Sequence, residues 1–212
     1  LVLSFNALEQ YYQDQGRDWE RYAMIKARVV AGDQAAGAQL LDMLRPFVYR
    51  RYLDFSAIEA LRTMKQLFQQ EVRRKGMADN IKLGAGGIRE VEFIAQAFQL
   101  IHGGRDLSLQ QRPLLNVLGT LEGQGYLPAA VISELRSGYE FLRYTEHAIQ
   151  AIADRQTQML PDSPEDQARI AFMLGFSDWA AFHERLMYWR GRGDWHFSQV
   201  IVDPEEEEGE ER

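Results

Sequence analysis

The chain has 212 residues, which suits one large domain or two small ones, and its apolar fraction of 46% is typical of a globular protein. It has no cysteine, which excludes disulfides and thiol catalysis and favours a reducing, cytoplasmic location. Residues 203–212 carry −6 of the net charge of −7, so the rest of the chain is nearly neutral and gives no electrostatic reason to expect nucleic acid binding.

The two ends of the chain carry few structural signals. No run of about 18 apolar residues is present, so the sequence predicts no membrane-spanning helix. Leu1 to Phe5 lack the basic stretch of a signal peptide, and without a starting methionine the chain resembles a piece of something longer. Seven acidic residues in 203–212 cannot bury apolar surface, so we expect an acidic linker or tail there.

Helical patterns fill most of the first half of the chain. Ser4 and Asp18 are expected to cap the first two helices, and Gly32 is expected to close the second. The third helix is expected to stop before Pro46, because proline removes a backbone donor. The predicted helices are, in chain order, 4–13, 19–31, 34–44, 55–75 and 88–102.

The second half of the chain continues in the same way. Helices are predicted at 114–123, 128–155, 164–174 and 177–202, the second of them with Pro128 in its first turn. Alternating strand patterns are nearly absent, although Ile81 to Leu83 could pair briefly. The predicted class is therefore all-α, an antiparallel helical bundle that forms one domain over residues 1–202.

A glycine-rich loop, Asn80 to Gly87, runs directly into the helix predicted at 88–102. Glycines let backbone N–H groups approach a ligand, and the start of a helix adds free donors and a positive dipole end, a combination that favours phosphate. Lys82 precedes the glycines and also suits phosphate oxygens. The loop matches neither the Walker A motif nor the Rossmann pattern, so by itself it is a weak signal.

The helix after the loop carries one polar stripe, formed by Arg89, Glu92, Gln96 and Gln99. Glu90 instead lies on an apolar side of the helix. A carboxylate there needs an arginine, backbone donors, a metal-bound water or a cleft. Acidic residues in a first turn also stabilise the helix dipole, so a structural role for Glu90 is the alternative to a chemical one.

Two long motifs make the chain resemble a known family. One reads Lys82-Leu83-Gly84-Ala85-Gly86-Gly87-Ile88-Arg89-Glu90-Val91-Glu92-Phe93, and the earlier one reads Trp19-Glu20-Arg21-Tyr22-Ala23-Met24-Ile25-Lys26-Ala27-Arg28-Val29-Val30-Ala31-Gly32. Both resemble the bifunctional glutamine synthetase adenylyltransferase/adenylyl-removing enzymes, and the resemblance covers residues 1 to about 202. The related uridylyltransferase family shares distant helical features with the chain but is not expected to share this loop.

The resemblance implies a nucleotidyltransferase activity. The family carries two nucleotidyltransferase units in tandem: the N-terminal unit removes AMP from a tyrosine of glutamine synthetase by phosphorolysis, and the C-terminal unit adds AMP from ATP. The chain resembles the helical half of the N-terminal unit. The residues Gly16-Arg17-Asp18-Trp19-Glu20 and Arg89-Glu90 favour that half, since the other typically has Thr-Asp after Gly-Gly-Ile.

The chain departs from the family pattern at the metal site. The family's Gly-Ser-x-Asp-x-Asp motif is absent from the sequence. The resemblance therefore implies that Mg²⁺ is bound mainly by a missing domain, that this chain holds no metal ligands, and that it is inactive by itself. It further implies ATP, ADP and phosphate as substrates or products. The expected partners are glutamine synthetase, the PII signalling protein and the rest of the same polypeptide, with no nucleic acid and no membrane.

The resemblance also implies a set of site residues. Arg89 and Glu90 are the expected catalytic residues. Trp19 could instead be a core anchor, and Arg28 could simply pair with Glu20. The whole chain could also be a non-catalytic docking module for glutamine synthetase or PII. The residues expected to bind phosphate or nucleotide are Lys82, Gly86, Gly87, Lys26, Arg28, Trp19 and Glu20.

Overall fold

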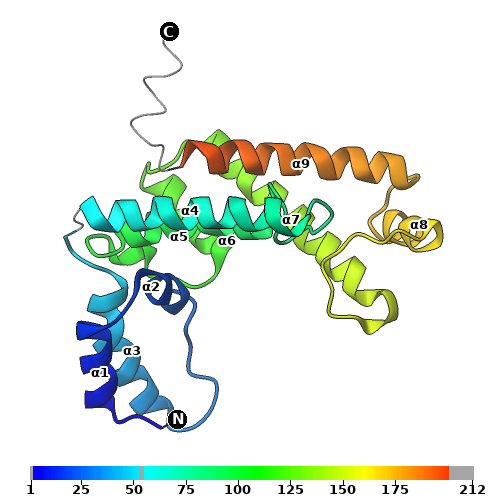
Figure 1. The fold of residues 1–212 in the computed structure, drawn as a ribbon. Coiled ribbons are helices and arrows are strands. Elements are labelled where there is room, and N and C mark those ends of the chain that lie inside the picture. Colours follow the sequence, from blue (N-terminus) through cyan, green and yellow to red (C-terminus); the bar gives the residue numbers. More distant parts are fainter. Residues whose placement is uncertain (1, 53–54, 201–212) are drawn as a thin grey trace. The chain divides into compact units, whose positions relative to one another are not determined.

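The computed structural model describes residues 2–52 and 55–200, except for the side chains at 55–57, 73, 75 and 153 (Figure 1). The predicted acidic tail, 203–212, lies outside the described residues. Within them the fold is all-α, as predicted, and contains no strand. None of its helices is both long enough and apolar enough to span a bilayer. The helices are α1 Phe5–Asp14, α2 Asp18–Met24, α3 Gln34–Val48, α4 Phe55–Lys75, α5 Ile88–His102, α6 Leu114–Gly123, α7 Ala129–Ala151, α8 Pro164–Met173 and α9 Trp179–Gln199, with 3₁₀ turns η1 Leu107–Leu109 and η2 Ile152–Asp154.

The chain divides into two compact units. Unit 1 comprises residues 1–64 and 95–121, and unit 2 comprises residues 65–94 and 122–212. The three boundaries between the units fall inside α4, inside α5 and near the end of α6. The single domain predicted over residues 1–202 stays a prediction.

Most helix ends follow the sequence signals. The Ser4 hydroxyl accepts a hydrogen bond from the Ala7 N–H (3.3 Å) and caps α1. Gly76 and Gly175 adopt the left-handed conformation, with φ of 59° and 78°, just beyond the ends of α4 and α8. The brief strand pairing was expected at Ile81 to Leu83. It occurs one residue earlier, as an isolated antiparallel bridge between Asn80 and Met159.

The second predicted helix was too long. α2 ends at Met24, and the bonds that follow, from Lys26 N to Ala23 O and from Ala27 N to Met24 O, are three-residue turns. The β-branched Val29 and Val30 favour extended backbone over helix. In addition, Asp33 accepts a hydrogen bond from Ala36 N (2.9 Å), so the next helix starts its own cap at this point.

The third predicted helix was too short, because Pro46 lies inside α3. Pro46 costs the helix the hydrogen bond that its own N–H would have donated, and only two residues, Phe47 and Val48, follow it in α3. Burial of Leu44 and Val48 on either side of it offsets that cost.

The predicted helix 128–155 was too long, since α7 stops at Ala151 and η2 follows it. The last helix, α9, is capped by Asp178 rather than by Ser177, because the Asp178 side chain accepts a hydrogen bond from the Ala181 N–H (2.8 Å).

In unit 1, α1 and α2 both contact α3 (Figure 1). Tyr12 of α1 packs on Phe47 of α3, with ring centroids 4.7 Å apart. Arg21 of α2 donates from Nε to the Phe47 carbonyl oxygen (3.1 Å). These contacts attach α1 and α2 to the longer helix α3. Neither α1 nor α2 is long enough to be stable as an isolated helix.

In unit 2, α7, α8 and α9 contact one another in pairs (Figure 1). An aromatic group formed by Phe141, Phe176, Trp179 and Phe182 lies at their junction, with centroids 5.0–6.1 Å apart. The first residue of α5 and the loop residue Ile81 belong to the same core. Its buried members are Ile81, Ile88, Leu142, Ala148, Ile149, Ile170, Ala171, Phe182 and Leu186.

Candidate functional site

The glycine-rich loop of unit 2 uses most of its backbone donors internally. The Asn80 side-chain oxygen accepts from the N–H groups of Lys82 (3.0 Å) and Leu83 (2.8 Å), and the Asn80 carbonyl accepts from Gly84 (2.8 Å). Gly87 N donates to the Gly84 carbonyl (3.0 Å). An Asx turn of this kind fixes the loop locally. The loop therefore does not present a row of free N–H groups to a phosphate ion.

The first turn of α5 is closed in the same way. The N–H groups of Ile88 and Arg89 donate to the carbonyl oxygens of Ile81 (3.1 Å) and Lys82 (3.0 Å). A helix start binds anions through its unsatisfied donors. Because these two donors are already paired, the predicted phosphate cradle at the start of α5 is occupied by the chain's own loop.

Arg190 of α9 explains why the loop is rich in glycine. Its Nε donates to the Ala85 carbonyl (2.9 Å) and its Nη1 to the Ala78 carbonyl (2.6 Å). A Cβ added to Gly86 would lie 1.8 Å from the Arg190 carbonyl oxygen, and one added to Gly84 would lie 2.4 Å from Arg190 Nη2. Gly86 and Gly84 thus permit α9 to pack directly on the loop.

Glu90 is buried, with 1% of its surface exposed. Its Oε2 accepts a hydrogen bond from the Gly86 N–H at 2.7 Å. Burial raises the pKa of Glu90 to about 7, and the nearby Asp194 carboxylate raises it further, while the Gly86 hydrogen bond, Arg89 and Arg190 oppose the shift. Of the partners that the sequence left open, the structure provides backbone donation, and the Glu90 carboxyl holds the loop onto α5.

Arg89 joins α4 to the loop. Its Nη1 donates to Glu71 Oε2 (3.1 Å), and its Nη2 donates to the carbonyl oxygens of Phe68 and Leu83 (both 3.3 Å). The guanidinium also lies 4.3 Å from the centroid of the Phe68 ring. Arg89 is thus committed to internal contacts.

Lys82 differs from its neighbours in the loop. Its side chain is half-buried, and its ammonium group has no hydrogen bond or ion pair with any described residue. The predicted residues Lys82, Gly86, Gly87, Arg89 and Glu90 therefore do lie together, within unit 2. Of these five, only Lys82 offers a charge that the chain itself does not already use.

The predicted residues at 19–28 belong to unit 1. Trp19 is 60% exposed, so it is not a core anchor. The Glu20 carboxylate accepts from the Tyr11 hydroxyl (2.9 Å) and from the Arg17 N–H (2.9 Å). Arg28 is exposed and forms no ion pair with a described residue, so the alternative pair with Glu20 is not formed. Lys26 Nζ donates to the Arg112 carbonyl (2.7 Å).

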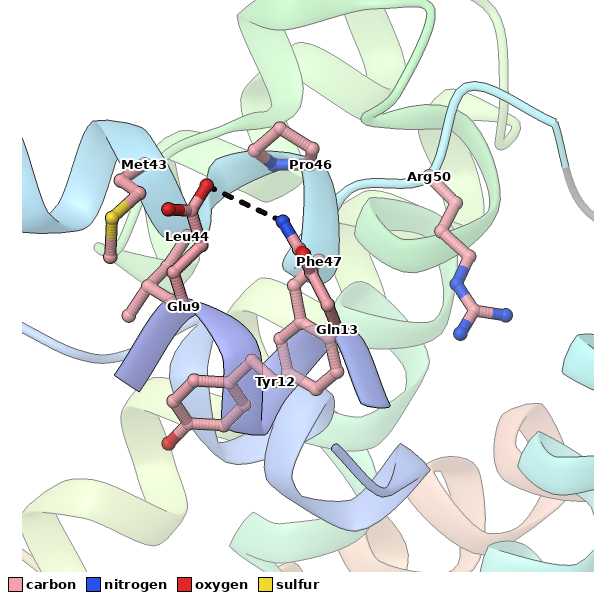
Figure 2. A pocket seen from close by; sticks show the side chains of 8 residues that line it. All are labelled: Glu9, Tyr12, Gln13, Met43, Leu44, Pro46, Phe47 and Arg50. Carbon is pink, nitrogen blue, oxygen red and sulfur yellow. Dashed lines mark hydrogen bonds between the residues drawn. The ribbon is translucent and has the colours of Figure 1, made fainter. Parts of the chain in front are cut away.

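A small pocket of about 280 Å³ also lies in unit 1, between α1 and α3 (Figure 2). Its walls include the Tyr12 and Phe47 rings and Arg50. Gln13 donates to Glu9 at 3.4 Å across its rim, the bond drawn in Figure 2. None of the predicted site residues lines this pocket.

Arg190, which contacts the loop from α9, was not among the residues predicted from the sequence. The pattern Arg190-Gly191-Arg192-Gly193 could have revealed it, because glycines inside a long helix often mark a close approach of another backbone. Gly193 fits that rule, since a Cβ there would lie 3.0 Å from the Gly86 carbonyl oxygen.

Two family models match the chain. One described as GlnD PII-uridylyltransferase matches residues 62–200, and one described as glutamate-ammonia ligase adenylyltransferase matches residues 1–43. The first match includes the glycine-rich loop. Whether the uridylyltransferase family shares the residues of this loop stays a prediction.

Curated relatives match nearly the whole chain. The bifunctional glutamine synthetase adenylyltransferase/adenylyl-removing enzyme of Pseudomonas putida is 87% identical over 99% of this chain and 22% of its own length. The enzymes of the same name from Pseudomonas aeruginosa and Nitrosococcus oceani are 82% and 58% identical, over 100% and 96% of this chain. The chain spans 21–22% of the length of these relatives.

Proposed function

Because the chain belongs to the family of bifunctional glutamine synthetase adenylyltransferase/adenylyl-removing enzymes, we propose that it is the helical part of the unit that removes AMP from glutamine synthetase. The observation that carries the proposal is the identity of 82–87% with three enzymes of this name over 99–100% of the chain. The proposal includes a cytoplasmic location, and PII as a regulatory partner of the whole enzyme.

The proposed reaction is phosphorolysis. An oxygen of inorganic phosphate attacks the phosphorus of the adenylyl group, the bond from that phosphorus to the tyrosine oxygen breaks, and ADP and the free tyrosine hydroxyl result. The opposite half of the enzyme would transfer AMP from ATP to the same tyrosine. Charge accumulates on phosphate oxygens in such a reaction, so positioned cations are the main contribution that a helical part can make.

In unit 2 the proposed contribution is the Lys82 ammonium group. It is the one predicted loop cation that no described residue engages, and it extends from a loop held rigid by Asn80, Glu90 and Arg190. Arg89 and Glu90 are then positioning residues rather than the catalytic residues expected from the sequence, because their contacts connect the loop to α4 and α5. Gly86 and Gly87 serve the shape of the loop.

In unit 1 the proposed contribution is to nucleotide binding. Trp19 offers an exposed indole for stacking on an adenine ring, and the exposed Arg28 offers a cation for its phosphate. Glu20 orients the start of α2 through Tyr11 and Arg17, and Lys26 anchors the segment after α2 on Arg112.

Mg²⁺ is expected for the family, but the described residues do not fit it. No three of their His, Asp or Glu side chains gather in a group that could hold a metal ion. No step assigned to this chain passes through the metal.

A docking role is the second candidate function. The internal hydrogen bonds of the loop favour this role, because N–H groups that already donate within the loop cannot bind a phosphate ion. In this case the chain would hold glutamine synthetase or PII and take no part in the chemistry. The two functions predict different results for a variant that still binds its partner: turnover falls if the chain takes part in the reaction, and turnover is unchanged if the chain only docks the partner.

Replacement of Trp19 by alanine in a full-length enzyme with this sequence is expected to lower kcat/KM for AMP removal by about ten- to a hundred-fold, the effect of losing one base–aromatic stack. The measurement is ADP release from adenylylated glutamine synthetase in the presence of phosphate. Trp19→Phe is the matched control and should keep most of the activity, since it retains an aromatic face.

Binding of glutamine synthetase to the same variants should be measured in parallel. Reduced ADP release with unchanged partner binding supports a role in the reaction. Unchanged release from Trp19→Ala would contradict the nucleotide role of unit 1, and equal losses of release and binding would favour docking.

A further inference from the structure

An open groove of about 610 Å³ lies on unit 2, between the end of α4, the loop before α5 and the outer side of α9. Met77, Leu160 and Met187 give it apolar walls, and Asp79 and Asp194 give it negative charge. None of these five residues has a role in the function proposed above.

Gly191 forms part of the groove wall, and no contact with a described residue requires glycine there. It lies in the interior of α9, where glycine costs about 1 kcal/mol relative to alanine. A Cβ added at Gly191 would meet no atom within 4 Å, whereas one at Gly193 would meet the Gly86 backbone. The absent side chain leaves space along this part of the groove wall, which suits a ligand that lies directly against the helix.

The charges of the groove select the ligand. Asp79 and Asp194 are exposed, and their carboxylates form no hydrogen bond or ion pair with a described residue, but both interact electrostatically with the Arg190 guanidinium, so two carboxylates share one internal cation. Arg190 also lines the groove, but its Nε and Nη1 are directed to the carbonyl oxygens of Ala85 and Ala78. Carboxylates at the rim repel phosphate and attract a cation. A bare metal ion does not fit, because no described group of three acidic or histidine side chains is available to hold it.

We infer that this groove binds a lysine or arginine side chain of a protein partner. The aliphatic stem of such a side chain lies over Gly191 against the two methionines, and its charged end lies at Asp79 and Asp194. Methionine walls adapt to flexible stems, and long cationic side chains bury their stems while keeping the charge at a polar rim.

The test is an NMR titration of the whole chain with the acetylated, amidated tripeptide Gly-Arg-Gly at low ionic strength. The matched probe is the same tripeptide with citrulline, which has nearly the shape of arginine without its charge. Saturable shifts of the Gly191 and Ala85 amides are expected with the arginine peptide and not with the citrulline peptide.

Three variants locate the binding. Asp79→Asn and Asp194→Asn should each weaken it about two- to five-fold, as loss of an exposed ion pair does. Gly191→Leu should weaken it at least about ten-fold by filling the groove, and its fold should be retained because the site is open and leucine favours helix. Glu122→Gln, the same kind of charge change at an exposed residue of unit 2 outside the groove, should have no effect.

Equal binding of the two peptides, or the absence of saturable shifts, would overturn the inference. So would unchanged binding by Gly191→Leu, since the ligand would then lie elsewhere. If Glu122→Gln weakened binding as much as Asp194→Asn does, the binding would be only a general attraction of a cation to an acidic protein.

Discussion

Replacement of Gly86 by alanine is expected to lower the free energy of unfolding of unit 2 by at least about 4 kcal/mol. Two costs add. Gly86 has φ of 65°, a conformation that costs other residues about 1–2 kcal/mol. The larger cost is steric, because the new Cβ would lie 1.8 Å from the carbonyl oxygen of Arg190, a backbone atom inside a helix that cannot move aside cheaply.

Gly76→Ala is the matched control. Gly76 has nearly the same φ, 59°, but a Cβ there would meet nothing within 4 Å. Its replacement should therefore cost only the conformational penalty, about 1–2 kcal/mol. Urea unfolding followed by tryptophan fluorescence measures both, since three of the four tryptophans, Trp179, Trp189 and Trp195, belong to unit 2. Equal losses for the two variants would show that α9 does not pack on the loop as described.

Replacement of Glu90 by glutamine is expected to remove a strong pH dependence of stability. Burial raises the pKa of Glu90 from 4.5 to about 7 in the folded chain. Because the folded pKa lies above the unfolded one, the neutral carboxyl contributes stability that is complete below pH 4.5 and is lost as the pH rises through 7. The stability lost over this pH range is about 3 kcal/mol, since a tenfold change in a protonation equilibrium corresponds to about 1.4 kcal/mol.

Glutamine keeps an oxygen that can accept the Gly86 N–H but has no proton to lose. The free energy of unfolding of Glu90→Gln minus that of the natural chain should therefore rise by about 3 kcal/mol as the pH is raised from 4.5 to 8. Urea unfolding at a series of pH values measures that difference. Glu122→Gln serves as the control at an exposed carboxylate. A difference that stays constant with pH would mean that the Glu90 carboxylate is already stabilised as an anion.

The helices with clear end signals could be predicted from the sequence. The ranges 55–75, 88–102 and 114–123 are confirmed to the residue, because Gly76, Gly103 and Gly123 stand where helices stop. α3 was misplaced because tertiary burial overrides the local signal of Pro46, and α2 because the β-branched residues after it and the Asp33 cap end it early. Leu44 and Val48 extend α3 past Pro46, whereas no comparable burial supports a helix through Val29 and Val30.

The candidate site was predictable only in part. The five residues predicted in the loop and the first turn of α5 lie together, and Lys82 is the one of them whose charge no described residue engages. The sequence could not show that Glu90 turns back to Gly86, or that Arg190 reaches Ala85 from 105 residues away. Both contacts depend on the packing of α9 against the loop. They change the expected role of the glycines from holding phosphate to allowing that packing.

The most direct test of the proposed function is the phosphate dependence of AMP removal in a full-length enzyme in which Lys82 is replaced by methionine. Loss of one cation at a transferring phosphoryl group typically costs about a hundred-fold in rate. The proposal therefore predicts slower ADP release and a raised KM for phosphate, partial recovery in Lys82→Arg, and unchanged binding of glutamine synthetase. An unchanged rate and an unchanged KM for phosphate would contradict the phosphate role proposed for Lys82 and, together with unchanged release from Trp19→Ala, would leave docking as the function of the chain.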